Sequence, residues 1–257
     1  MGALDGRHAL VTGGGSGIGA AIASALSHAG ASVTIAGRQK TRLADVVAGF
    51  RNGAAVVADV TRADDCKAMV AAAREKFGPL DIVVANAGAA ESAPFARIDG
   101  GHWQRMLDVN LTGAFHTVQA ALPDLIREAG TNGLRRLVLV ASTAGLKGYP
   151  YVAAYCAAKH GVVGLTRALS AELATTGITV NAVCPGFTQT PLLEASVAAI
   201  SIKTKRSAAE ARSALAKDNA HKRLVTPEEV AQTVLWLCMP AAASINGQAV
   251  AISGGQV

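Results

Sequence analysis

Two side chains able to exchange protons, a phenol and an ammonium, lie four residues apart at Tyr155 and Lys159. The surrounding pattern predicts a helix over residues 152–175, and at this spacing both side chains share one helical face. An ammonium beside a phenol stabilises the phenolate, so we expect Lys159 to lower the pKa of Tyr155 from about 10. Tyr155 is therefore a candidate general acid or base, although a core-facing Tyr beside a solvated Lys would show the same spacing.

A hydroxyl group is expected near this pair, because the apolar run 137–140 is typical of a strand and ends in Ala141-Ser142-Thr143. Ser142 lies thirteen residues before Tyr155, at the carboxyl end of that strand. Open α/β sheets hold their active sites at this edge. The sequence therefore places Ser142 and Tyr155 in one candidate active site.

The length of 257 residues and the 51% content of hydrophobic residues predict one globular domain with a sizeable core. The charged fraction, 16%, is too low for a disordered chain. No stretch of about 18 uncharged apolar residues occurs, and residues 1–7 lack the apolar region of a signal peptide. We therefore expect a soluble, cytoplasmic protein that does not contact a membrane.

Metal and nucleic-acid sites are not expected. The cysteines are far apart, with no Cys-x-x-Cys spacing and no nearby His pattern, so they read as reduced, buried thiols. The net charge of +6 would suit nucleic acid, but aromatic residues make up only 4% and no basic run is interleaved with them. The four cysteines are Cys66, Cys156, Cys184 and Cys238.

A glycine-rich segment follows the first predicted strand, 7–11, and opens a helix that runs to about residue 28. Glycines let the backbone approach a pyrophosphate, and a helix N-terminus offers unpaired N–H groups to it. A glycine turn that merely packs strand on helix is the alternative, and the flanking strand and helix favour the dinucleotide site. The candidate cofactor-binding residues are Thr12, Gly13, Gly15, Ser16, Gly17, Ile18 and Gly19.

Arg38 follows a second predicted strand, 32–36, where dinucleotide-binding folds usually carry an acidic residue for the ribose hydroxyls. An Arg at this place accommodates the 2′-phosphate of NADP. A solvated loop Arg is the alternative. The sequence therefore favours NADP(H), with NAD(H) as the second choice.

Polar and small residues follow three more predicted strands, over 54–58, 80–85 and 178–183. Asp59 either touches a cofactor or supports a helix cap that the pattern Thr61-x-x-Asp64 predicts. An apolar helix is expected over 110–129, and Asn110 at its start could cap it or bind water. The remaining candidate cofactor-binding residues are Asp59, Val60, Asn86, Ala87, Gly88, Pro185, Gly186, Thr188 and Thr190.

Strands and helices alternate along the chain, and a last strand is expected over 248–252. This order predicts an α/β fold with a doubly wound parallel sheet of the Rossmann type, in a single catalytic domain over residues 1–257. Gly177 is expected to end the helix over 152–175. An Ala-rich segment, 191–222, interrupts the alternation before a helix over 227–238. An insertion at this place predicts a helical substrate lid.

In this order and spacing the motifs resemble the short-chain dehydrogenase/reductase family across the whole chain. They are Thr12-Gly-x-x-x-Gly17-x-Gly19, Asn86-Ala87-Gly88, Asn110, Ser142, Tyr155-x-x-x-Lys159 and Pro185-Gly186. The resemblance implies strand order 3-2-1-4-5-6-7, a nicotinamide cofactor and a homotetramer.

The resemblance also implies the roles of four residues. Tyr155 would be the catalytic acid/base, Ser142 would hold the substrate oxygen, and Lys159 would bind the nicotinamide ribose. Asn110 would hold a water of the proton relay. A protein of this fold that only senses a dinucleotide is the competing class, but it has no physical reason to keep all four residues.

The substrate is less strongly indicated. The stretch 178–225 resembles both 3-oxoacyl-thioester or polyketide reductases and 3-hydroxybutyrate dehydrogenases. The hydroxybutyrate enzymes would hold a free carboxylate with polar residues where this chain has Ala90, Ala144 and Val152. Aromatic polyketide reductases would show Pro-Gly-Gly where this chain has Ala89-Ala90-Glu91-Ser92. An acyl-CoA or acyl-carrier-protein thioester is favoured, with a small carbonyl compound, hydroxy acid or polyketide as alternatives.

The lid carries most of the net charge. Residues 195–225 hold seven Lys or Arg and two carboxylates, a net charge of +5 out of the chain's +6. A solvated helix face is the plain explanation. A positive lid beside the active site would instead attract substrates that carry phosphates on a long arm.

Overall fold

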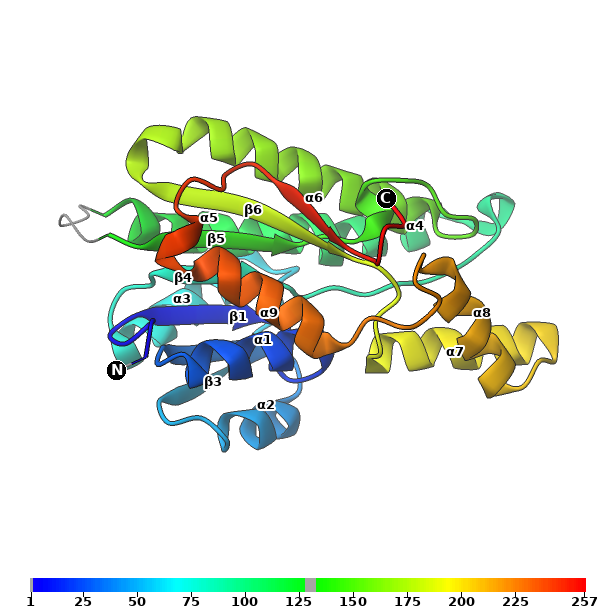
Figure 1. Ribbon diagram of the computed structural model, residues 1–257, viewed down its shortest axis with the longest axis horizontal. Coiled ribbons are helices and arrows are strands. Elements are labelled where there is room, and N and C mark those ends of the chain that lie inside the picture. Colours follow the sequence, from blue (N-terminus) through cyan, green and yellow to red (C-terminus); the bar gives the residue numbers. More distant parts are fainter. Residues whose placement is uncertain (1, 128–132) are drawn as a thin grey trace.

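One parallel β-sheet forms the centre of the protein (Figure 1). The computed structural model describes residues 2–127 and 133–257. Within these residues seven strands follow the order β3-β2-β1-β4-β5-β6-β7, and every neighbouring pair is parallel. The predicted sheet and strand order are confirmed. The strands are β1 (His8–Thr12), β2 (Ser32–Gly37), β3 (Gly53–Val57), β4 (Ile82–Ala85), β5 (Arg135–Val140), β6 (Ile178–Pro185) and β7 (Ala249–Ile252).

Helices cover both faces of the sheet. Helices α3, α5 and α6 pack on one face, and α1, α2 and α9 pack on the other (Figure 1). Along β5, Leu137 and Leu139 join the first layer, while Val138 and Val140 join the second, because successive side chains alternate across a strand. The helices are α1 (Gly17–His28), α2 (Lys40–Val47), α3 (Ala63–Phe77), α4 (Gly100–Leu107), α5 (Gly113–Ile126), α6 (Ala153–Glu172), α7 (Pro191–Thr204), α8 (Ala208–Asp218) and α9 (Pro227–Cys238).

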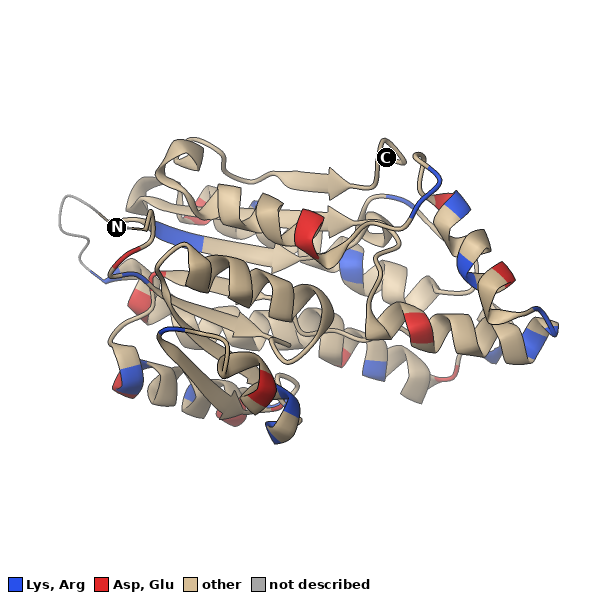
Figure 2. Cartoon of the chain, turned by 60° about the horizontal axis from the view of Figure 1, so that its bottom comes forward, with Lys and Arg blue, Asp and Glu red and all other residues tan. Residues whose placement is uncertain are grey.

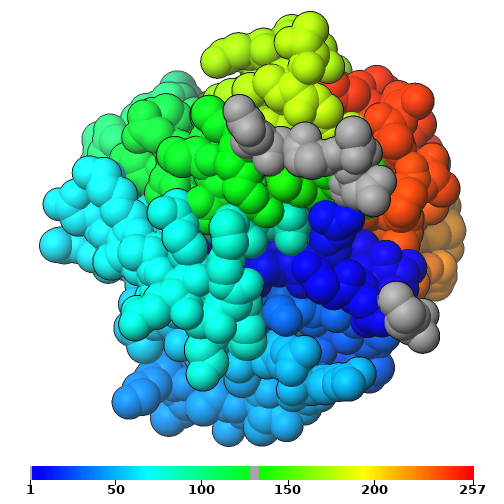
Figure 3. All heavy atoms as spheres, turned by 90° about the vertical axis from the view of Figure 1, so that its left-hand side faces the viewer, coloured from blue at the N-terminus to red at the C-terminus, as the bar shows by residue number. Residues whose placement is uncertain are grey.

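Ion pairs close the end of the sheet at which the strands begin. Asp81 Oδ1 lies 2.9 Å from nitrogens of both Arg127 and Arg135, and 3.8 Å from Arg7. Figure 3 looks onto this end, where the blue N-terminal segment lies beside cyan, green and red segments. Three guanidinium groups thus surround one carboxylate at this end. Open α/β sheets bind their ligands at the opposite end, where the strands finish.

Asn110 does not start a helix, contrary to the prediction. It lies in a π-helical turn, Asp108–Thr112, that joins α4 to α5. The helical segment begins earlier, at Gly100, and the Asp99 side chain caps it by accepting from His102 N at 2.6 Å. Helix α5 ends at Ile126, and residues 128–129 of the predicted helix lie outside the described residues. A π-turn adds a residue to the helical ladder and frequently marks a functional position.

The predicted helix cap at Thr61 is also wrong. Helix α3 starts after Arg62, whose side chain makes no capping bond. The amide and hydroxyl of Thr61 donate to Asp59 Oδ1 at 3.0 and 2.8 Å instead, because the turn folds back on the end of β3. Helix α6 ends at Glu172, earlier than expected, and Gly177, with φ +77°, ends the 3₁₀ turn Ala174–Thr176 that follows it.

The insertion 191–222 consists mainly of α7 and α8, which extend beyond the carboxyl ends of the strands (Figure 1). We call this pair of helices the lid. Leu193, Val197 and Ala211 form a small hydrophobic cluster of their own, separate from the two cores on the sheet. The lid is therefore held together internally and joins the sheet through its ends.

Candidate active site

The glycine-rich loop between β1 and α1 has a backbone conformation that favours glycine. Gly13 and Gly17 have φ values of +67° and +52°. A Cβ at Gly19 would lie 2.3 Å from Gly13 O, so the loop and the first turn of α1 are in contact. Ser16 precedes α1 without capping it through its side chain. The first N–H groups of α1 are therefore suited to bind an anion, as the motif predicts.

Thr12 and Asn86 join the ends of the two central strands. Thr12 Oγ1 accepts from the backbone N–H groups of Asn86 and Ala87 at 3.1 and 3.2 Å. Asn86 Nδ2 donates in return to Thr12 O at 2.9 Å. These hydrogen bonds fix Asn86 and Ala87 beside the glycine loop, so the two predicted motifs belong to one surface.

Asn110 lies under the segment that follows β4. Its side chain is buried, accepts from Ala89 N at 3.2 Å and donates to Ala89 O at 2.8 Å. A Cβ at Gly88 would lie 2.8 Å from Asn110 Oδ1 and 3.6 Å from Lys159 Nζ. The structure therefore brings Gly88, Asn110 and Lys159 together, from three different elements.

Lys159 is buried in α6 and points towards the end of β5. Its Nζ donates to Val140 O at 2.8 Å, which leaves further ammonium donors unused by that bond. Burial lowers the pKa of Lys159 to about 8, because a low-dielectric site disfavours the charged form. Lys159 is still largely protonated at neutral pH.

The pKa of Tyr155 moves in the direction opposite to the prediction. Burial raises it to about 12, although a hydrogen bond with the Ser142 side chain opposes the shift. Lys159 Nζ lies 5.7 Å from the centroid of the Tyr155 ring and donates to Val140 O. The expected net lowering is not found, because desolvation is the largest cause of the shift and Lys159 is not among the groups that shift this pKa. The predicted meeting of Ser142 with Tyr155 is confirmed.

The loop after β6 joins the lid to the glycine loop. Thr190 caps α7 by accepting from Leu193 N at 3.2 Å, and a Cβ at Gly17 would lie 3.3 Å from Thr190 Cβ. Thr188 is buried and donates to Gly186 O at 2.9 Å. Pro185, Gly186, Thr188 and Thr190 therefore lie along one edge of the candidate site, as predicted.

The remaining predicted residues differ in exposure. Arg38 is exposed directly after β2, and no described residue hydrogen-bonds or ion-pairs with it. Val60 is buried, and Gly113 is so close that a Cβ there would lie 2.6 Å from Val60 Cγ2. One oxygen of Asp59 holds Thr61, as described above. Arg38 is therefore free to bind a ligand, whereas the Val60 side chain fills the core.

No sequence pattern indicated Asn219, and only a weak one indicated Tyr149. Asn219 is fully buried, accepts from Phe187 N at 3.0 Å and donates to Phe187 O at 2.9 Å, so it ties the end of α8 to the loop after β6. Tyr149 donates to Thr143 Oγ1 at 2.8 Å. A Tyr in the Gly148-Tyr149-Pro150 turn between Ser142 and Tyr155 could have been noticed from the sequence.

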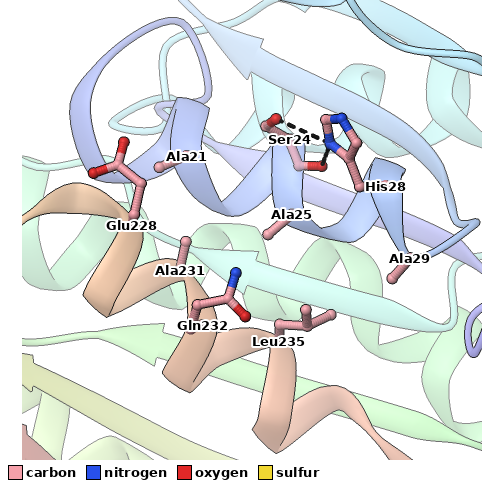
Figure 4. Close-up of a pocket in the computed structure, with 9 residues that line it drawn as sticks. All are labelled: Ala21, Ser24, Ala25, His28, Ala29, Glu228, Ala231, Gln232 and Leu235. Carbon is pink, nitrogen blue, oxygen red and sulfur yellow. Dashed lines mark hydrogen bonds between the residues drawn. The ribbon is translucent and has the colours of Figure 1, made fainter.

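A groove of about 440 Å³ lies between α1 and α9, apart from the candidate site (Figure 4). Four of its nine lining residues are alanines, and Glu228 and Gln232 also line it. The His28 ring there bonds back to Ser24 O of its own helix at 2.8 Å. None of the predicted site residues lines this groove, so it is separate from the candidate site.

Two further observations concern the described part of the chain. No cluster of three or more His, Cys, Asp or Glu that could hold a metal ion occurs in residues 2–127 and 133–257. Across the same ranges, no helix has the length and apolarity needed to cross a membrane. All four cysteines are buried, and none of them forms a disulfide bond.

Comparisons with known proteins agree with this geometry. The family model described as short chain dehydrogenase matches residues 7–200. The D-beta-hydroxybutyrate dehydrogenase of Rhizobium meliloti is 35% identical over 97% of this chain and 98% of its own. The 3-oxoacyl-(acyl-carrier-protein) reductase of Synechocystis sp. is 36% identical over 100% of this chain and 99% of its own.

A solved structure agrees throughout its length. The crystal structure of actinorhodin polyketide ketoreductase with NADPH has a TM-score of 0.93 and 37% identity, and covers 100% of this chain and 99% of that one. Both the sequence matches and this structural match span the candidate site. The chain belongs to the short chain dehydrogenase family and is an oxidoreductase.

Proposed function

We propose that this protein is an NADP(H)-dependent ketoreductase whose favoured substrate is a 3-oxoacyl or 3-hydroxyacyl thioester. The observation that carries the proposal is the grouping of three side chains: Ser142 is close enough to Tyr155 to affect its pKa, and Lys159 Nζ lies 5.7 Å from the centroid of the Tyr155 ring. Two hydroxyls directed at one place suit a carbonyl oxygen that gains negative charge.

The residues present fit a nicotinamide dinucleotide. The N-terminus of α1, Gly13 and Gly19 would hold its pyrophosphate, since a Cβ at Gly19 would close the loop. Gly88 and Lys159 would hold the nicotinamide end. When bound, the nicotinamide supplies or accepts the hydride.

The chain's own residues handle the oxygen and the proton. With a pKa of about 12, Tyr155 keeps its proton at neutral pH and can give it to the oxygen of a ketone. Ser142 donates a hydrogen bond to the same oxygen, which elsewhere is worth roughly 3 kcal/mol per donor. The Lys159 ammonium stabilises the phenolate that remains, and Asn110 holds Ala89 in place and supports the water of a proton relay.

The substrate side of the site supports a thioester. Ala144 is buried and Ala90 and Val152 are partly buried, so none of the three offers a charge or hydrogen-bond donor to a free carboxylate from its side chain. A hydroxybutyrate dehydrogenase needs such donors. A small carbonyl compound or a polyketide is the second candidate, because neither carries a free carboxylate that the site must bind.

Steady-state assays on a panel of simple ketones, 3-hydroxybutyrate and 3-oxoacyl thioesters, each with NADH and NADPH, test the proposal. We expect the highest kcat/KM for a 3-oxoacyl thioester with NADPH. A higher value for 3-hydroxybutyrate or for a simple ketone would replace the proposed substrate. The acyl carrier protein as a partner, the homotetramer and the cytoplasmic location stay predictions.

Cofactor preference depends on Arg38. We expect Arg38→Ala to lower the ratio of kcat/KM for NADPH over NADH about 10- to 100-fold, because a hydrogen bond to a charged group contributes about 1.5–3 kcal/mol. Arg51→Ala removes another exposed Arg and should leave the ratio as it is. An unchanged ratio in Arg38→Ala would show that NADP(H) selection lies elsewhere.

Two of the positive charges counted in residues 195–225 are neutralised by carboxylates outside that range. Glu194 pairs with Arg212, and Glu229 pairs with Arg223, and both carboxylates lie just outside residues 195–225. Within residues 195–225, the cations that ion-pair with no described residue are Lys203, Lys205, Arg206, Lys217 and Lys222. Figure 2 shows how Lys and Arg are distributed over the chain. The lid therefore stays positive next to the candidate site.

Salt should act on charged substrates more than on neutral ones. Between about 0.05 and 0.5 M salt, we expect kcat/KM for an acyl-CoA to fall at least about threefold more than for an uncharged ketone at saturating cofactor, since salt screens the lid's field. The double variant Lys205→Gln/Arg206→Gln should narrow this gap. Arg51→Gln/Lys76→Gln, with the same charge change far from the lid, should not. If salt lowered kcat/KM equally for both substrates, the charges of the lid would only be solvated and would not attract the substrate.

A further inference from the structure

Tyr149 is a partly buried aromatic residue that several parts of the chain hold in place. Its hydroxyl donates to Thr143 Oγ1 at 2.8 Å. Its ring meets Phe187 edge to face, with centroids 6.0 Å apart and planes at 88°. The Lys147 ammonium lies 5.1 Å from the ring centroid. Aromatic and cation contacts of this kind fix the orientation of the ring.

These contacts put the ring next to the proposed reaction centre. Thr143 directly follows Ser142, and Phe187 directly follows Gly186 in the loop after β6. The Tyr149 phenol also influences Tyr155, because it contributes to the raised pKa of Tyr155. The ring is therefore bonded to the residue directly after Ser142 and packs on the residue directly after Gly186.

Phe187, whose ring contacts Tyr149, is also attached to the lid. Asn219, at the end of α8, holds Phe187 through two backbone hydrogen bonds of 3.0 and 2.9 Å. Asp218, its neighbour, is one of the groups that raise the pKa of Tyr149. Tyr149 thus links Thr143, the residue after Ser142, to Phe187 at the base of the lid.

Tyr149 lies at the edge of the packed interior, because its ring contacts Phe187, which packs against the small cluster of the lid. Tyr149 belongs to none of the three hydrophobic clusters formed by the described residues. Its neighbour Tyr151 is 66% exposed and meets the chain through its backbone, whose carbonyl accepts from Ala93 N at 2.8 Å. Of these two tyrosines, only Tyr149 has its ring fixed, and part of that ring still faces outward.

We propose that Tyr149 contacts the substrate and limits the size of the group bonded to the carbonyl carbon on the side facing the lid. The inference rests on the proposed function, in which Ser142 and Tyr155 hold the substrate oxygen. A methyl group or a narrow alkyl chain fits beside a fixed ring. An aryl group on the carbonyl carbon occupies the same space as the ring and is rejected. Tyr149 is then a specificity-determining residue of this chain.

The test compares two N-acetylcysteamine thioesters, 3-oxobutanoyl and 3-oxo-3-phenylpropanoyl, which differ only in methyl against phenyl on the reacting carbon. Tyr149→Ala in the full chain should raise the phenyl-over-methyl ratio of kcat/KM at least about tenfold, since a pocket discriminates by 10- to 200-fold per small group. Tyr149→Phe keeps the ring and should keep the wild-type ratio. Tyr149→Leu, an apolar but smaller side chain, should raise the ratio in the same direction as Ala.

The outcomes separate the two proposals. An unchanged ratio in both Ala and Leu variants that still bind NADPH and melt like the wild type overturns the role of Tyr149. A shift in Tyr149→Phe as large as in Tyr149→Ala overturns it too, because the hydroxyl bond to Thr143 would then matter rather than the ring. Failure of the proposed function would give a different result. The wild-type protein would then reduce no thioester, or Tyr155→Phe would keep the wild-type turnover.

Discussion

Tyr155→Phe is expected to lower kcat about 10²- to 10⁴-fold, the usual contribution of a positioned acid or base. The substitution keeps the ring but removes the proton and the hydrogen bond with Ser142. Binding of NADPH should change little, because the glycine loop and Lys159 are untouched. Single-turnover kinetics of ketone reduction and a fluorescence titration with NADPH measure the two quantities separately.

Tyr151→Phe is the matched control, since it makes the same chemical change on a phenol that is 66% exposed. We expect it to retain the wild-type kcat. If Tyr155→Phe kept more than about a hundredth of the rate, Tyr155 would not be the acid or base. The raised pKa adds a second check, because a buried phenol with a pKa of about 12 should show no ionisation by ultraviolet absorbance at pH 9 to 10.

Gly19→Ala should have the second largest effect. The new Cβ would lie 2.3 Å from Gly13 O and 2.5 Å from Asn86 Nδ2. Neither atom can retreat easily, because Gly13 has φ +67° and Asn86 is bonded to Thr12. The loop must shift, and a displacement of about 1 Å can cost 10²-fold in rate. We therefore expect kcat/KM for the cofactor to fall by about 10²-fold.

Gly49→Ala provides the comparison, because its Cβ would meet only Val46 O at an ordinary 3.6 Å. That variant should bind NADPH and melt like the wild type. Circular dichroism and the melting temperature show whether Gly19→Ala remains folded, and a titration then gives its affinity for NADPH. Wild-type affinity in a folded Gly19→Ala protein would mean that the glycine loop does not hold the cofactor.

Much of the fold could be predicted because it depends on local patterns. Apolar runs such as 137–140 predicted strands, the Gly13 to Gly19 spacing predicted a strand–loop–helix turn, and alternation predicted a parallel sheet. Parallel strands end on one edge, so residues placed after strands, such as Ser142, Asn86 and Gly186, come to the same side. The meeting of Ser142 with Tyr155 follows from that topology.

Helix starts were predicted less well, because the sequence near a helix end is compatible with more than one structure. Asn110 was expected at a start, but it lies in a π-turn where its amide bonds to Ala89 across the chain. Thr61 was expected to cap α3, but Asp59 competes for its hydroxyl. Each prediction was wrong because the side chain bonds to a residue outside the helix. Asn110 bonds to Ala89, which precedes it by 21 residues, and Thr61 bonds to Asp59, which precedes the helix.

The sequence by itself determined the sheet, the order of its motifs and which residues could do chemistry. Only the tertiary structure decided their electrostatics and their neighbours. Burial raises the pKa of Tyr155 where the nearby Lys159 alone predicted a lower one. Glu194 and Glu229 neutralise part of the lid, and Tyr149 bonds to Thr143, next to Ser142. Desolvation and contacts between distant segments depend on the whole fold, so no local pattern encodes them.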